Sequence, residues 1–471
     1  MVAAGAALRV RPEVREAIDT AHDGSILPPI FDARLYYRSA FHPYEIDDQG
    51  ECASCVFISA TRVAQIRAAI QRDEDNRRSA LGVWRATIRD KRKDPAGMIA
   101  ALDEFAELTR QRAKVGSVPQ EALVPTLDWE RFICCGLNEG AQCVNGNPAR
   151  SGDEGTCYHH VDGAPFSCDR DSDGVVPYHF LRHVQNTGFY AKQPFVAGKR
   201  LIDSIAPETP DAEMFAVHPP LTLHSGEVRL EDAKHIRSQI NAIKRSIMEF
   251  GPVMAMIRIG DDFDCWPEAA CDIAKAGGEA QAGGEAAGGD AEKAADATRR
   301  AYCLGSADAA REFHEVVVVG WGYADDGTPS WIVRNSYGPD FNDACAVSVD
   351  AVPLAYRSYA STLAKSYADA EICHLKGHVF VAMASTELLT AGRESDLENN
   401  VVAFLTNANT FGVGSSDMFD SVFESPNAKA GAMLQLRGPN ADHSFVSDVG
   451  AHVLVAAAVF LIGVWISKPG R

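Results

Sequence analysis

The sequence predicts an α+β fold, on the basis of one amphipathic helix near its start and a β-hairpin far downstream. From Cys55 onward, apolar residues recur at spacings of three and four, as on one face of a helix: Val56, Ala60, Val63, Ile66 and Ile70. Residues 314–322 form a β-branched run typical of a buried strand, and a turn signal at 325–327 separates it from a second strand at 330–335. Helical and strand patterns thus occupy separate parts of the chain, as α+β proteins require.

Composition sets limits on the partners and on the redox state. The chain has 471 residues, enough for two or three average domains, and its 46% of hydrophobic residues support a large core. A formal net charge of -19 argues against general nucleic-acid binding, because phosphate contacts need a basic surface. Twelve cysteines are many for a reduced cytosolic enzyme, and disulfide bonds are therefore expected.

Cys55 is a candidate nucleophile. The polar and small residues 47–54 give way to the helical pattern at this cysteine, which places Cys55 at a helix N-terminus. The partial positive charge there favours thiolate over thiol. The alternative interpretation is a buried half-cystine that opens a core helix.

A candidate base lies on the predicted hairpin. Folding the hairpin about its turn places Asn335 nearly opposite His314, within a residue or two of register. An amide beside an imidazole can hold the ring in one tautomer while the ring accepts a thiol proton. Alternatively, His314 merely ends a strand and Asn335 begins a turn.

Together these residues resemble the motifs of the papain family of cysteine proteases. Gln49, Cys52-Ala53-Ser54-Cys55, His314 and Asn335-Ser336 followed by Gly338 occur in that family's order. Residues 245–253 also resemble a segment of the family. The resemblance implies a two-lobe fold, with a helical left lobe and an antiparallel β-barrel-like right lobe, and no cofactor.

The resemblance also implies a role for each residue. Cys55 would attack the peptide carbonyl and form a thioester, and His314 would protonate the leaving amine. Asn335 would orient His314. The side-chain amide of Gln49 and the backbone N–H of Cys55 would form the oxyanion hole. Protein or peptide substrates are the expected partners.

A cysteine- and histidine-containing segment precedes the next predicted helix. Residues 157–163 resemble the occluding loop of cathepsin B-like members, whose paired histidines, here His159 and His160, bind a substrate's C-terminal carboxylate. By the same resemblance Cys52 would form a disulfide with Cys143 or Cys168. No paired CxxC spacing supports a metal site.

Residues 169–174 match the start of a calcium loop, but Phe180 stands where an EF-hand needs glutamate, so a full EF-hand is excluded and a weak calcium site stays open. Within that stretch, Gly174 alone preserves the family's substrate-binding glycine segment. We therefore expect Gly174 to contact substrate.

The predicted domain layout follows from these motifs. A short N-terminal extension (1–28) precedes a protease domain at 29–385, which carries insertions at about 72–125, 136–168, 267–300 and 343–375. The segment 72–125 is predicted to be a solvated helical hairpin. Residues 386–449 are predicted to form a stalk with some ordered segments, followed by a transmembrane helix at 450–467 and a tail at 468–471.

The segment 450–467 predicts a single-pass membrane anchor. It carries no charge at neutral pH apart from His452, and its eighteen residues rise about 27 Å as a helix, enough to cross the hydrocarbon core. The alternative is a terminal core helix or strand. The side of the membrane and the organelle stay open, because a C-terminal anchor places the enzyme in the cytosol whereas Lys468 and Arg471 favour the opposite orientation.

The sequence thus predicts a membrane-anchored cysteine peptidase that acts through Cys55, His314 and Asn335. One alternative is an inactive papain-like scaffold that binds peptides or a partner at a membrane. Another is exopeptidase action limited by His159 and His160.

Overall fold

The structure, a computed structural model, describes residues 27–41, 46–72, 79–91, 95–114, 126–133, 158–164, 166, 168, 174–187, 189–190, 213–215, 221–222, 233–260, 263, 301–304, 312–342 and 344–403. Several predicted features lie outside these residues. They are most of the N-terminal extension, Cys143, the insertion at 267–300, the chain from 404 to 449 and the predicted membrane helix at 450–467.

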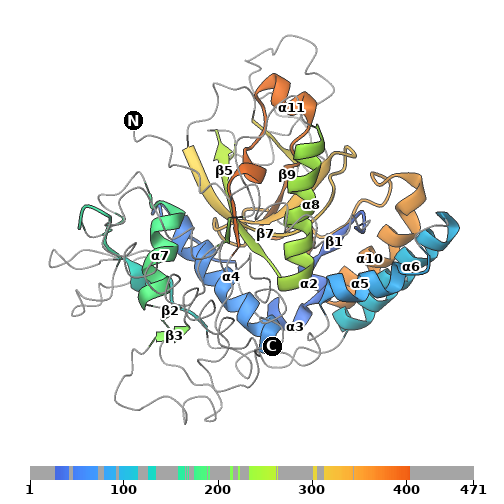
Figure 1. The fold of residues 1–471 in the computed structure, drawn as a ribbon, viewed down its shortest axis with the longest axis horizontal. Helices are drawn as coiled ribbons and strands as arrows, with labels where there is room; N and C mark the ends of the chain where they lie inside the picture. The colour runs from blue at the N-terminus through green and yellow to red at the C-terminus, as the bar shows by residue number, and fades with distance from the viewer. Residues whose placement is uncertain are drawn as a thin grey trace, which may run out of the picture.

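A mixed sheet forms the centre of the described fold (Figure 1). It has eight strands, seven of them in the order β4-β10-β5-β7-β8-β9-β6, with β1 paired to β7. All of its pairs are antiparallel except β6 with β9. The strands are β1 (Phe31–Asp32), β4 (Leu221–Thr222), β5 (Val253–Ile259), β6 (Ala301–Tyr302), β7 (Glu312–Tyr323), β8 (Pro329–Arg334), β9 (His378–Ala382) and β10 (Val401–Ala403). A separate pair joins β2 (Phe189–Tyr190) to β3 (Glu213–Phe215).

Helices surround this sheet, so the predicted α+β class is confirmed for the described residues. They are α2 (Ala33–Tyr36), α3 (Arg38–Phe41), α4 (Cys55–Arg72), α5 (Ala80–Ile88), α6 (Pro95–Lys114), α7 (Pro177–Thr187), α8 (Ala233–Phe250), α10 (Arg357–Asp369) and α11 (Thr386–Ala391). Short 3₁₀ turns are η3 (Glu130–Phe132), η8 (Leu354–Tyr356) and η9 (Leu397–Asn399).

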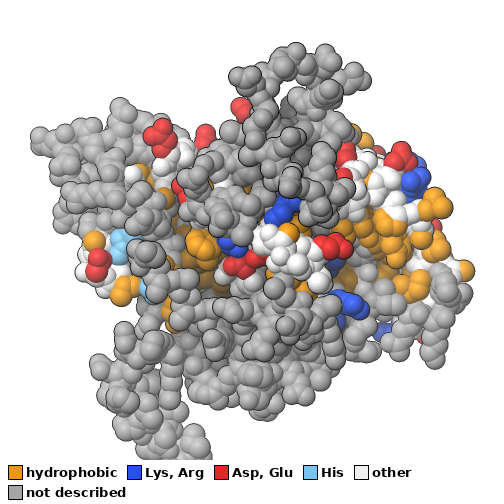
Figure 2. Space-filling view, turned by 90° about the horizontal axis from the view of Figure 1, so that it is seen from above, with side chains coloured by type: hydrophobic (Ala, Val, Ile, Leu, Met, Phe, Trp, Pro, Cys, Tyr) orange, Lys and Arg blue, Asp and Glu red, His pale blue; other side chains and the backbone are white. Residues whose placement is uncertain are grey.

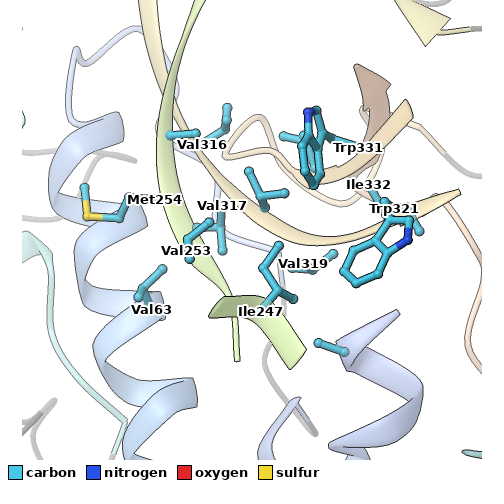
Figure 3. Close-up of a cluster of buried hydrophobic side chains, with 14 of the residues drawn as sticks. Val63, Ile247, Val253, Met254, Val316, Val317, Val319, Trp321, Trp331 and Ile332 are labelled. Atoms are coloured by element: carbon cyan, nitrogen blue, oxygen red, sulfur yellow. The ribbon is translucent and has the colours of Figure 1, made fainter. Parts of the chain in front are cut away.

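The core lies where α4 and α8 meet the sheet. Figure 3 shows Val63 of α4 and Ile247 of α8 near valines of β5 and β7, with Trp321 and Trp331 close by. All five apolar positions that predicted α4 are at most 3% exposed. Arg67 is also fully buried on α4, and its guanidinium donates to the carbonyl oxygens of Pro252 and Gly251. These bonds fix α4 to the turn between α8 and β5.

The predicted hairpin is β7 and β8. Val317 pairs with Arg334, and the register shifts between Val318 and Gly320. Asn335 follows directly after β8, and His314 lies three residues before Val317 on β7. The two residues therefore come together at the end of the hairpin that is far from its turn.

Two of the predicted insertions pack against each other. The insertion at 72–125 forms α5 and α6, and the insertion at 343–375 forms α10. In Figure 1 these three helices lie together at the right. Asp369 of α10 accepts from Arg110 of α6 at 2.7 Å. The expectation of a solvated hairpin therefore needs correction, because Leu102, Phe105 and Ala106 of α6 are buried and Phe105 packs on Tyr36 at 5.8 Å between ring centroids.

Hydrophobic side chains gather on one side of the face in Figure 2, the side on which α6 and α10 lie in Figure 1, and charged side chains edge them. Exposed apolar residues of this region include Ile99 and Leu354. Among the described residues, no helix combines the length and the apolar character needed to cross a membrane.

The sheet continues past the predicted end of the protease domain at residue 385. Val401 pairs with Ala255 and Val402 with Met254, so β10 lies between β5 and β4. The Glu398 carboxylate accepts from the indole N–H of Trp331 at 2.7 Å. The start of the predicted stalk is thus part of the fold, because its β-branched residues cover an edge of β5 that would otherwise be unpaired.

Candidate active site

Cys55 is the first residue of α4 and its thiol is free. The loop before it is tied down by a disulfide between Cys52 and Cys168, with an S–S distance of 2.01 Å. Cys55 itself is 8% exposed. The sulfur accepts hydrogen bonds from the backbone of Val56 and of Cys55, as a side chain at a helix N-terminus can.

His314 and Asn335 form a buried pair. Nε2 of His314 lies 2.7 Å from Oδ1 of Asn335, and the two residues are 3% and 2% exposed. The Asn335 oxygen also accepts from the backbone N–H of Ser336 at 2.9 Å, which fixes the amide. If Nε2 donates to this oxygen, Nδ1 is the ring nitrogen left to exchange a proton with another group.

Aromatic rings cover this pair. The ring of Tyr337 lies 4.9 Å from that of His314, and Phe263 lies 5.9 Å from both. Phe341 packs on Tyr337 at 5.5 Å. These rings exclude water from the bond between His314 and Asn335, which strengthens it because the local dielectric constant is low.

Glu315 connects the cysteine to the strand that carries the histidine. β8 ends at Arg334, opposite Val317, so β8 offers no ladder partner to the main chain at Glu315. Helix α4 supplies partners there: the Ser59 hydroxyl donates to the Glu315 carbonyl oxygen at 3.0 Å, and the Glu315 backbone hydrogen-bonds the Cys55 sulfur. The thiol therefore lies against the residue that follows His314.

Burial sets the protonation of both reacting groups. Burial raises the pKa of the Cys55 thiol to about 12, although hydrogen bonds from the Glu315, Val56 and Cys55 backbone oppose this. Burial lowers the pKa of His314 to about 4, and the bond to Asn335 opposes that shift. The expectation that the helix end favours thiolate is thus corrected, because desolvation outweighs the helix end and both groups are neutral at pH 7.

Gln49 is held between the two halves of the site. Its backbone N–H donates to the Ser336 carbonyl oxygen at 2.8 Å, and the Ser336 hydroxyl donates to its side-chain oxygen. Its Nε2 donates to the Cys52 carbonyl oxygen at 3.0 Å, which uses one of the two amide hydrogens. The second hydrogen is left for another acceptor.

A cluster of charged residues surrounds Asp47, two residues before Gln49. Asp47 accepts from Arg62 of α4 at 2.7 Å, from the Trp129 indole at 3.1 Å and from Arg334 of β8 at 3.4 Å. Burial alone would raise the pKa of Asp47, but Arg62 and Arg334 outweigh it and lower the pKa to about 2. Asp47 thus joins the Gln49 loop to the strand that leads to Asn335.

The other predicted site residues have separate places. Gly174 adopts a left-handed conformation (φ +68°), and a Cβ built there would lie 3.6 Å from the Ala53 carbonyl oxygen, so Gly174 lies beside the Cys52–Cys55 loop. His159 is exposed, with Nδ1 3.2 Å from the Gly163 oxygen, and the His160 ring lies 5.6 Å from that of Tyr158. Cys143 lies outside the described residues.

Sequence reasoning missed two parts of the site. The Asp47 cluster combines residues far apart in the chain, and its only sequence signal is an arginine inside an apolar helix pattern. Glu315 is the second part, and neither of its carboxyl oxygens has a hydrogen-bond partner among the described residues.

No family model matches the chain. A stretch of 31 residues is 52% identical to the cathepsin B-like protein CP1 of Giardia intestinalis, and the match spans 7% of this chain and 10% of that relative. The chain resembles papain-like cysteine proteases.

Solved structures give a distant likeness. The procathepsin B S9 of Trypanosoma congolense is 13% identical, with a TM-score of 0.36 over 82% of this chain and 79% of that one. The procathepsin L2 of Tenebrio molitor is 12% identical, with a TM-score of 0.34 over 82% and 70%. Bromelain of Ananas comosus is 9% identical, with a TM-score of 0.32 over 80% and 99%.

Proposed function

We propose that the protein is a cysteine peptidase that hydrolyses peptide bonds through Cys55, His314 and Asn335. One observation carries the proposal: a free thiol at the start of α4 lies against the main chain of Glu315, the neighbour of a histidine that is bonded to a buried amide. A nucleophile, a base and a group that orients the base are the parts of a thiol hydrolase.

In this proposal each group has a defined step. The Cys55 sulfur attacks the peptide carbonyl carbon while its proton passes to Nδ1 of His314, and a thioester forms as His314 returns that proton to the leaving amine. Water then hydrolyses the thioester with His314 as base. The second Nε2 hydrogen of Gln49 and the Cys55 backbone N–H stabilise the oxyanion. Because both reacting groups start neutral, proton transfer accompanies attack in place of a preformed ion pair.

Active-site labelling tests the proposal. An epoxysuccinyl or diazomethyl ketone peptide is expected to modify native protein at Cys55, and Cys55→Ala is expected to prevent modification. Gln49→Ala is expected to lower the peptide-cleavage rate by about 100- to 1,000-fold, because one oxyanion donor is lost. Native protein that is neither modified nor able to cleave peptides would contradict the proposal.

A second candidate function is a peptide-binding scaffold. The burial of Cys55 and His314 favours it, because both groups are neutral and at most 8% exposed. In that case native protein and Cys55→Ala bind fluorescent peptides equally, and neither form hydrolyses them. Cleavage by native protein alone dismisses the scaffold.

Exopeptidase action is a further alternative within the same chemistry. Changing His159 and His160 together to alanine is then expected to increase attack on internal bonds, whereas an unchanged cleavage pattern dismisses an exopeptidase limited by these histidines.

We also propose that residues 450–467, which lie outside the described residues, anchor the protein in a membrane. The uncharged, apolar character of the segment supports this. Deletion from residue 450 onward is expected to release the protein from carbonate-washed membranes. Persistence of the shortened protein in the membrane pellet would count against the anchor.

A further inference from the structure

Glu315 is a buried acid that the proposed reaction does not use. The residue is 2% exposed, and both of its carboxyl oxygens lack hydrogen-bond partners among the described residues. A buried polar group without a partner costs free energy that a folded protein normally avoids, so its presence needs an explanation. A buried carboxyl group without a partner retains its capacity to accept hydrogen bonds from a ligand.

The carboxyl group lies near the reacting sulfur. In its ionised form it would raise the pKa of the Cys55 thiol electrostatically, and the Glu315 backbone hydrogen-bonds the Cys55 sulfur. On the neighbouring strand β5, Met256 stands directly opposite Glu315 and contributes no charge. The nearest arginine on β5 in register, Arg258, forms an ion pair with Glu394 at 3.3 Å.

The sheet face that carries Glu315 becomes exposed two residues before it, at Phe313. Residues directly opposite in an antiparallel pair share a face, so Phe313, Glu315 and Val317 share theirs with Arg258, Met256 and Met254. Along that face Val317 and Met254 are buried, Met256 is half-buried and Phe313 is 56% exposed. Apart from Arg258, whose charge Glu394 balances, an apolar rim therefore leads from solvent to an acid beside the nucleophile.

We propose that Glu315 binds the cationic side chain of an arginine or lysine close to the scissile bond of the substrate, so that the peptidase selects basic peptides. The inference rests on the proposed peptidase function and adds its substrate class. A guanidinium presents parallel N–H donors that can satisfy both carboxyl oxygens at once. The apolar rim would pack against the aliphatic part of the same side chain.

The electrostatics of the empty site agree with this role. Burial raises the pKa of Glu315 well above its ordinary value, which favours the neutral acid when no cation is bound. An entering guanidinium stabilises the carboxylate, and the carboxyl proton leaves to solvent. Binding thus forms one buried ion pair and leaves no unpaired charge. A citrulline side chain has nearly the same shape but no charge, so its binding to Glu315 is expected to be much weaker.

A series of fluorogenic peptides tests the proposal. A single arginine is moved position by position along an otherwise neutral peptide, and each member is paired with its citrulline equivalent. At one position the native protein is expected to show a kcat/KM for arginine at least about tenfold higher than for citrulline, which is typical of a charge-assisted hydrogen bond. Glu315→Gln is expected to bring this ratio close to one.

Two controls keep the test decisive. Glu312→Gln removes an exposed carboxylate from the same strand, and the arginine preference is expected to persist in it. Glu315→Met serves as a second variant if Glu315→Gln does not fold. A ratio near one at every position in native protein, or a preference that survives in Glu315→Gln, overturns the inference but leaves the peptidase standing. Absence of all cleavage, together with an unlabelled Cys55, overturns both.

Discussion

The Cys55 thiol is subject to two opposing influences. Its place at the start of α4 gives it backbone N–H donors, which favour thiolate, while burial in a site that is closed by aromatic rings favours the neutral thiol. Burial is the larger influence, and the same burial keeps His314 neutral. At the residue scale, burial therefore favours the neutral form of both groups.

The first prediction concerns the reactivity of this thiol. Because the pKa of Cys55 is raised to about 12, its thiolate fraction is small at neutral pH and grows about tenfold per pH unit. Alkylation of Cys55 by iodoacetamide is expected to accelerate steadily from pH 6 to pH 9, as followed by mass spectrometry. A rate that is constant across that range would indicate a preformed thiolate–imidazolium pair.

The second prediction concerns Asp47. Its pKa is lowered to about 2, below the ordinary value of about 3.9, so its ionised form stabilises the folded state at pH values above about 4. This contribution is lost as the pH falls toward 2. Asp47→Asn is expected to lower the free energy of unfolding by about 2–3 kcal/mol at pH 7 and by much less near pH 2, as measured by urea denaturation.

A matched control for Asp47 is Asp350→Asn. The Asp350 side chain is 93% exposed and pairs with Arg357 at the surface, where an ion pair contributes little. Equal losses of stability in the two variants, or a loss in Asp47→Asn that does not depend on pH, would show that the Asp47 cluster has no special role.

At the scale of elements, β7 organises the site. It pairs with β5, β8 and β1, contacts α4 through Glu315 and carries His314 at its start. Gly320 allows β1 to lie close, because a Cβ at this position would be 2.2 Å from the Phe31 carbonyl oxygen. The start of the described chain is therefore held on the strand that carries the candidate base.

Gly320 provides the third prediction. Gly320→Ala is expected to displace β1 and to lower the free energy of unfolding by about 1–3 kcal/mol, the usual cost of overpacking a filled core. Gly322→Ala is the matched control, because its Cβ would meet Ile30 Cγ2 at 3.4 Å, an ordinary contact. Chemical denaturation of both variants measures the difference, and equal effects would refute the close-approach argument.

At the scale of the whole molecule, the segments added to the central fold are part of its packing. α6 and α10, which are more than two hundred residues apart in sequence, form one helical layer, and Arg34 and Asp32 connect α10 to the start of the chain through Tyr367. β10 completes the sheet from the C-terminal side. Removal of any of these segments exposes core surface.

The fourth prediction follows from β10. A chain that ends at residue 385 loses β10 and the Glu398 bond to Trp331, so it is expected to unfold cooperatively at a lower temperature or to aggregate. A chain that ends at residue 403 keeps every described strand. Its melting temperature is expected to be well above that of the chain that ends at residue 385. Thermal unfolding followed by circular dichroism compares the two, and equal melting temperatures would restore the boundary at residue 385.

Local patterns in the sequence were sufficient to predict the helix that begins at Cys55, the hairpin of β7 and β8, and the approach of His314 to Asn335. Periodicity and turn residues specify these features over short stretches of chain. The helical pattern locates Cys55 at the start of a helix, and the hairpin pattern places His314 opposite Asn335. Both candidate reacting groups could therefore be named from the sequence.

Only the tertiary structure decided the rest. The neutral state of Cys55 and His314 depends on burial, and burial depends on rings and strands that come from other parts of the chain. The Asp47 cluster, the packing of α6 on α10 and the burial of the Glu315 carboxyl group likewise arise from contacts between distant segments. A sequence pattern reports which residues share a face of one element, and it carries no information on which other element will cover that face.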